Sequence, residues 1–147
     1  MRLWHKDLIS VLPDKQLICQ WRECCAIARS IVVNGTPNHL LVNKVMNYPK
    51  WHFMRYTIEV CEELEKRGHK IDRRRFFKWF DQWDDGTVKT DDFVSHADLF
   101  KDWHNERYLK QCYCNLQEKY DCGGFSKDEW WEIVRKVIEG ISYENVL

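Results

Sequence analysis

The sequence predicts an all-α protein: a single compact domain over residues 1–147, with about five to seven helices and an extended N-terminal segment. Two observations predict this class. Apolar residues recur along most of the chain with the i, i+3, i+4, i+7 spacing of an amphipathic helix. No segment of useful length shows the two-residue alternation of a strand, and a chain of this length is typical of one domain with a sizeable core.

The start of the chain divides into an extended segment and a long helix. The first twelve residues lack a convincing helical period and are expected to run extended across the helical body. A helix follows from Pro13 until Asn34-Gly35 ends it. The apolar face of this helix consists of Leu17, Trp21, Cys24, Cys25, Ala28, Ile31 and Val32.

Capping and turn residues set the bounds of the remaining helices. Thr36-Pro37, Pro49 and Asp72 are suited to helix starts, and Ser126 with Glu129 forms a capping box. Glycines at 68, 123, 124 and 140 are suited to helix ends and interruptions. Helices are therefore expected over residues 37–46, 49–67, 73–83, about 90–120 and 127–140.

The composition favours a cytoplasmic protein with reduced thiols. No apolar run approaches the ~18 residues that span a membrane, and the start lacks the apolar region of a signal peptide. Seven cysteines, an odd number in a chain without an export signal, favour free thiols over disulfides.

The net charge is zero, but the charges are unevenly distributed. Residues 1–80 hold 15 Lys and Arg against 8 Asp and Glu, and residues 81–147 hold 8 against 15. Such a chain could present a basic face to phosphates while remaining neutral overall. The two halves could equally attract each other.

No metal or other cofactor is expected. The set His104, Cys112, Cys114 and Cys122 lacks the usual Cys-x-x-Cys spacing of a zinc site, so buried thiols are the favoured interpretation. The segment containing Asp81, Asp85, Gly86 and Asp92 is similar to a calcium loop, but Trp83 occupies the third ligand position and excludes that interpretation.

The N-terminus offers an unusual chemical group. Arg2 is too large for removal of the initiator residue, so Met1 is expected to remain. A main-chain α-amine has a pKa of about 7.7–8, so a useful fraction of such amines is nucleophilic at neutral pH. His5 is the histidine expected nearest to such a site. Arg2 in that position could also be without functional meaning.

Two polar stripes run along the first helix. Lys15, Arg22 and Arg29 recur every seven residues and form a basic stripe, and Gln16 and Glu23 form its neighbour. Glu23 has no cation at the helical i±3 or i±4 positions. A solvated polar face is the ordinary interpretation of such stripes, and a binding site is the alternative.

The stretch LISVLPDKQLICQWRE is similar to the N-terminal signature of the phage-type pyrimidine-dimer DNA glycosylases, the endonuclease V family. The similarity covers roughly the first 70 residues, continues through Val33-Asn34-Gly35 and Lys66-Arg67-Gly68, and is closest to a prokaryotic branch. Arg22-Glu23 is its most specific element. The residues in register are Ser10, Leu12, Asp14, Leu17, Trp21, Arg22 and Glu23.

The resemblance implies a DNA repair glycosylase with abasic-site lyase activity. With one residue inserted before Leu8, Met1 supplies the nucleophilic amine and Glu23 the catalytic carboxylate. The resemblance implies a monomer that needs no metal, acts on nucleoid-associated double-stranded DNA and recognises damaged or abasic sites. The side chains expected to contact this DNA are Arg2, Lys15, Gln16, Arg22 and Arg29.

Two questions stay open at this point. The chain is neutral and lacks a clear equivalent of the family's C-terminal aromatic run, so the lesion could be a pyrimidine dimer, another damaged base or an abasic site alone. The alternative to an enzyme is a non-catalytic helical module that keeps the fold and binds DNA or a protein.

Overall fold

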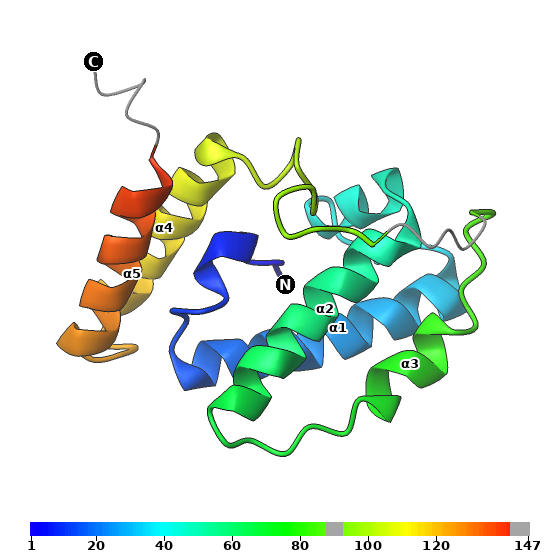
Figure 1. Cartoon of the computed structure of the whole chain (residues 1–147), viewed down its shortest axis with the longest axis horizontal. Coiled ribbons are helices and arrows are strands. Elements are labelled where there is room, and N and C mark those ends of the chain that lie inside the picture. Colours follow the sequence, from blue (N-terminus) through cyan, green and yellow to red (C-terminus); the bar gives the residue numbers. More distant parts are fainter. Residues whose placement is uncertain (88–92, 142–147) are drawn as a thin grey trace.

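Helix α1 (Asp14–Asn34) runs through the centre of the computed structural model, which describes residues 1–87 and 93–141 (Figure 1). Pro13 precedes its first turn, and Gly35 ends it with a φ of 77°. The predicted apolar face points into the core: Leu17, Trp21 and Cys24 are buried, while Cys25 and Val32 pack at its edge. This helix is the scaffold on which the other elements are arranged.

Helices α2 (Lys50–Lys66) and α3 (Arg74–Phe80) pack against α1. Helix α2 begins after Pro49 and ends before Gly68, as predicted. Helix α3 is shorter than expected, and the Asp72 carboxylate accepts a hydrogen bond from the Arg74 main-chain N–H at 3.1 Å near its start.

Helices α4 (Glu106–Asp121) and α5 (Lys127–Gly140) form a hairpin beside this body (Figure 1). The predicted capping box is confirmed, because Ser126 and Glu129 exchange side-chain to main-chain hydrogen bonds. At the closed end of the hairpin the Trp130 ring stacks on Tyr120 with centroids 5.1 Å apart. Trp130 therefore serves the packing of the pair.

The N-terminal segment lies between the two helical bodies (Figure 1), but it is extended only over residues 1–5, and residues 6–12 form turns instead of the predicted extended chain. It contains one short 3₁₀ turn, η1 (Lys6–Leu8), which the sequence did not predict. Leu3, Leu8 and Leu12 are almost completely buried. The segment is thus part of the core and cannot move independently of it.

The prediction of a helix over residues 37–46 is wrong. Only the 3₁₀ turn η2 (Val42–Asn47) forms there, and Asn38 has a φ of 57°. The Asn43 side-chain oxygen accepts hydrogen bonds from the Thr36 hydroxyl at 3.0 Å and the His39 main-chain N–H at 3.2 Å. These side-chain bonds offer the main chain an alternative to helix.

The helix expected over about 90–120 begins only at Glu106. Its expected start near Thr90 lies outside the described residues, and residues 93–105 form turns in which Phe100 has a φ of 47°. The Asn105 side chain caps α4 by accepting a hydrogen bond from the Tyr108 N–H at 2.9 Å. The sequence therefore predicted the second part of this helix and missed its cap.

All of the described helices together agree with the all-α class, and no strand occurs in residues 1–87 or 93–141. None of the described helices is long and apolar enough to cross a membrane. All seven cysteines are unpaired. The described part of the chain contains no group of three or more His, Cys, Asp or Glu arranged to hold a metal ion, and Asp92 of the calcium-like segment lies outside it.

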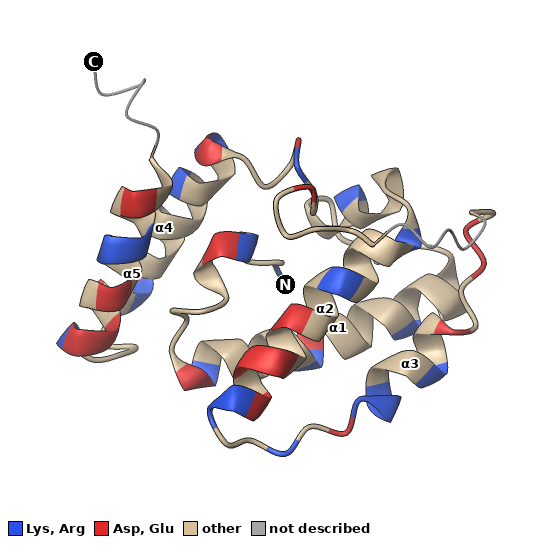
Figure 2. Ribbon diagram, in the orientation of Figure 1, with Lys and Arg blue, Asp and Glu red and all other residues tan. Residues whose placement is uncertain are grey.

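Acidic and basic residues are interleaved on η1, α2 and α5 (Figure 2). Within the described ranges, the ion pairs that join residues 1–80 to residues 81–147 are those of His96 with Asp7 and Glu59. In these pairs the cation, His96, comes from the net acidic residues 81–147, and the carboxylates of Asp7 and Glu59 come from the net basic residues 1–80. Direct ion pairing thus gives no support to a mutual attraction of the two halves.

Candidate active site

One cavity of about 300 Å³ brings the N-terminus next to the polar face of α1. Met1, Arg2 and Trp4 line it from the N-terminal segment. Gln16, Gln20 and Glu23 line it from α1, where their spacing of three or four residues places them on one helix face. The rest of the lining is Cys19 of α1, whose thiol is free and exposed, and Asn115, Glu118 and Lys119 of α4.

Gln20 and Glu23 hold the main chain of the N-terminal segment. The Arg2 N–H donates to Glu23 Oε2 at 3.2 Å. The Gln20 side chain donates from Nε2 to the Arg2 carbonyl at 2.9 Å and accepts from the Trp4 N–H at 2.8 Å. Gln20 is almost completely buried, so these bonds satisfy main-chain groups that water does not reach.

Two buried tyrosines hold the same segment from the opposite side. The Tyr56 hydroxyl of α2 donates to the Trp4 carbonyl at 2.6 Å, and the Tyr108 hydroxyl of α4 donates to the Leu3 carbonyl at 2.6 Å. Burial raises the pKa of both Tyr56 and Tyr108, so both remain protonated donors. Side chains from three helices therefore fix the main chain of residues 2–4.

A second set of bonds fixes the chain where η1 begins. The Lys6 N–H donates to His104 Nδ1 at 2.9 Å, and the Lys6 ammonium donates to the carbonyls of Ala97 and Leu99 at 2.9 and 2.7 Å. Burial holds the pKa of His104 well below its usual value, so the ring is neutral and Nδ1 accepts. His5 was expected near the site, but it is buried, stacks on His104 and does not line the cavity.

Replacing Gln20 with Leu is expected to lower the free energy of unfolding by about 3 kcal/mol, because two buried main-chain groups lose their partners. For a protein of this size that corresponds to a Tm lower by roughly 6–12 °C. Urea unfolding and calorimetry measure both quantities. Gln16→Leu is the matched control, since Gln16 lines the same cavity without bonding the N-terminal segment; equal losses in the two variants would refute the anchoring role.

The cavity brings together four of the seven predicted site residues: Met1, Arg2, Gln16 and Glu23. The other three, Lys15, Arg22 and Arg29, are exposed on α1 outside the lining. The Arg29 guanidinium lies 5.8 Å from the centroid of the Trp79 ring of α3. Their exposure leaves these cations free for an external partner.

Sequence reasoning missed Gln20, the two tyrosines and the α4 residues of the lining. The sequence could have indicated Gln20 as a site residue, because it lies three positions before Glu23 on the same helix face. Tyr108 is 105 residues from Leu3, and no local pattern indicates such a contact.

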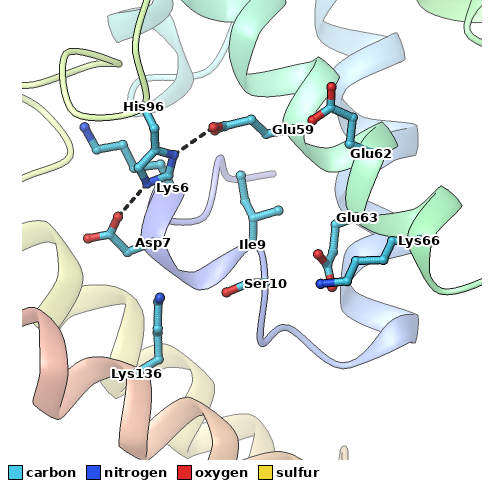
Figure 3. A pocket seen from close by; sticks show the side chains of 10 residues that line it. All are labelled: Lys6, Asp7, Ile9, Ser10, Glu59, Glu62, Glu63, Lys66, His96 and Lys136. Atoms are coloured by element: carbon cyan, nitrogen blue, oxygen red, sulfur yellow. Dashed lines mark hydrogen bonds and ion pairs between the residues drawn. The ribbon is translucent and has the colours of Figure 1, made fainter.

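A second cavity of about 290 Å³ is lined by residues of η1 and α2 together with His96 and Lys136 (Figure 3). His96 lies at its edge and donates to Glu59 through Nδ1 and to Asp7 through Nε2, both at 2.8 Å. These two hydrogen bonds raise the pKa of His96 to about 9. Because His96, Asp7 and Glu59 bind one another and neither Met1 nor Glu23 lines this cavity, it is a weaker candidate for the predicted chemistry than the N-terminal one.

The His96 cluster predicts a specific pH dependence of stability. The raised pKa of His96 means that its contribution is complete below its ordinary value of 6.5 and is lost as the pH rises through about 9. The hydrogen bond from His96 lowers the pKa of Asp7, whose contribution is present above its ordinary 3.8. The Tm difference between wild type and His96→Gln should therefore be largest at pH 4–6.5 and shrink by pH 9–10; a pH-independent difference would contradict this assignment.

Comparison with known proteins agrees with the resemblance seen in the sequence. The sequence model of the pyrimidine dimer DNA glycosylase family matches residues 1–76, just over half of the chain. No curated protein and no solved structure matches. The matched stretch includes the N-terminal segment, α1 and α2, and thus all of the cavity lining except that from α4. The chain therefore belongs to the pyrimidine dimer DNA glycosylase family.

Proposed function

We propose that this DNA repair glycosylase uses the α-amine of Met1 as its nucleophile and also cleaves the strand at the resulting abasic site. The observation that carries the proposal is the 3.2 Å hydrogen bond from the Arg2 N–H to Glu23. Because one residue spans at most about 3.5 Å, the Met1 nitrogen lies within about 7 Å of the Glu23 carboxylate. A sugar carbon between them can be reached by both groups.

In the first step the amine of Met1 attacks C1′ of the damaged nucleotide and the base leaves with the electron pair of the glycosidic bond. Positive charge develops on the sugar as this bond lengthens. The Glu23 carboxylate is positioned to stabilise that charge, as carboxylates do in glycoside hydrolysis.

In the second step the nitrogen lone pair expels the ring oxygen O4′, which takes a proton, and an imine links Met1 to the opened sugar. Glu23 removes the C2′ proton. The electrons of that C–H bond form a C2′–C3′ double bond while the C3′–O bond breaks, and the 3′ phosphate leaves with the bonding pair. Water then hydrolyses the imine and restores the amine.

The substrate is double-stranded DNA with a damaged pyrimidine or an abasic site, bound by the protein as a monomer on the nucleoid. Arg2 and Arg22 contact phosphates next to the lesion, with Arg29 further along α1. Lys15 and Gln16 reach the minor groove. The exposure of the α1 cations and the placement of Arg2 at the cavity mouth support these roles.

Borohydride trapping tests the proposal. Incubating the protein with abasic-site DNA and borohydride should reduce the imine to a permanent cross-link, and peptide mapping should assign the adduct to Met1. Acetylation of the α-amine should abolish the cross-link, because an amide nitrogen has no basic lone pair. Absence of trapping with intact DNA binding would instead favour a non-catalytic DNA-binding module.

Three lysines are the controls for this experiment. Lys119 lines the cavity, Lys15 is exposed nearby on α1, and the Lys6 ammonium is held by two carbonyls. At a saturating DNA concentration, which compensates for the weaker binding of Lys15→Ala, replacing each lysine with Ala should leave the yield of cross-link largely unchanged. Trapping that survives acetylation but disappears with one lysine would assign the nucleophile to that lysine.

A further inference from the structure

A second groove continues from the N-terminal cavity. It has a volume of about 620 Å³ and shares Arg2 and Asn115 with that cavity. Its far wall contains Arg107 and Lys110 of α4 and Leu41 from the turn before η2. Its charged lining residues are all cations, although Lys110 also lies 3.5 Å from Glu106. Such a groove is complementary to a phosphate backbone leading to Met1.

Leu40 is the chain neighbour of the groove residue Leu41. At 94% exposure it is the most exposed large apolar side chain among the described residues. The next most exposed, Phe93, is covered by the Arg55 guanidinium 4.5 Å from its ring centroid. Leu40 has no comparable cover.

The turn that carries Leu40 is held in place by hydrogen bonds. The Asn43 side chain, which follows Leu40 in the chain, accepts from Thr36 and from His39, which both precede it, so these bonds join the two ends of the turn. The Ser30 hydroxyl of α1 donates to the Thr36 carbonyl at 2.7 Å. The exposure of Leu40 is therefore a fixed feature of the fold.

We infer that Leu40 is a wedge that enters the DNA base stack next to the target nucleotide. The inference rests on the proposed function, because the amine can reach C1′ only if the damaged nucleotide is distorted or extruded. Extrusion leaves a gap in the stack, and apolar side chains inserted between base steps are a recurrent way of filling such gaps. Leucine suits this role because its side chain has no polar atom to desolvate between bases.

DNA with a tetrahydrofuran analogue of an abasic site and 2-aminopurine as the adjacent base tests the wedge. This analogue lacks the C1′ hydroxyl, so it cannot open to an aldehyde or form an imine, and binding is measured separately from the amine chemistry. Wild type should bind it and raise the 2-aminopurine fluorescence by unstacking that base. Leu40→Ala should bind about 10- to 100-fold more weakly, the equivalent of losing one buried leucine, and should not raise the fluorescence.

Matched variants make the outcome decisive. Ile138→Ala removes another exposed apolar side chain, from α5, and should behave as wild type. Leu40→Met should restore both binding and fluorescence. If Leu40→Ala matches wild type in both measurements, the wedge is refuted while borohydride trapping can still succeed. If trapping fails but Leu40 still governs binding of the analogue, the amine chemistry is refuted and the wedge is retained.

Discussion

Replacing Glu23 with Gln should abolish detectable strand cleavage at abasic sites. The expected loss of rate is about 10²–10⁴-fold, which is the usual contribution of a positioned proton acceptor. The amide keeps an oxygen that can accept the Arg2 N–H, so the N-terminal segment should stay anchored. It cannot carry the negative charge that stabilises the sugar, nor remove the C2′ proton. Gel assays of nicking measure the loss.

Glu118→Gln is the matched control for this substitution. Glu118 lines the same cavity from α4 but makes no hydrogen bond to the N-terminal segment, so its replacement should leave nicking within a few-fold of wild type. The free energy of unfolding of Glu23→Gln should change by no more than about 0.5 kcal/mol. A Tm several degrees lower with nicking intact would make Glu23 a structural residue instead.

One glycine added ahead of Met1 should slow trapping and nicking by about 100-fold or more. The addition moves the free amine by up to about 3.5 Å, and a displacement of even about 1 Å can cost that factor. The hydrogen bonds that hold residues 2–6 remain available, so affinity for DNA should be nearly unchanged.

The control for this extension is its removal. Cleaving the added glycine with an aminopeptidase, with the new N-terminus checked by mass spectrometry, should restore the wild-type rate. A rate that does not respond to the extension would exclude the α-amine as the nucleophile, whatever the effect of Glu23→Gln.

The helices that the sequence predicted well are those with local signals at both ends. Helix α1 lies between Pro13 and Gly35, and α5 begins with the capping box at Ser126. These signals act within a few residues, so a single sequence displays them. The same is true of the i, i+7 relation that placed Gln16 and Glu23 on one helix face.

The parts that could not be predicted depend on contacts between distant residues. The hydrogen bond from Tyr108 to Leu3 joins the N-terminal segment to α4, and no local pattern relates these two parts of the chain. Thr36-Pro37 is a local start signal that predicts a helix over residues 37–46, and the side-chain bonds of Asn43 favour a turn there instead. The proposed pair of Met1 and Glu23 could therefore be named from the resemblance, whereas the groups that hold residues 2–4 in place required the structure.

The 3₁₀ turn η1 changes the reach of the N-terminal segment. Each residue of a 3₁₀ helix advances about 2.0 Å and each extended residue about 3.3 Å, so a three-residue turn shortens the path by about 4 Å. That is close to the length of one extended residue. The family resemblance places one additional residue before Leu8, and η1 takes up the same length. On the proposed assignment of Met1 as the nucleophile, η1 would let a segment with one extra residue present its amine where a shorter segment ends.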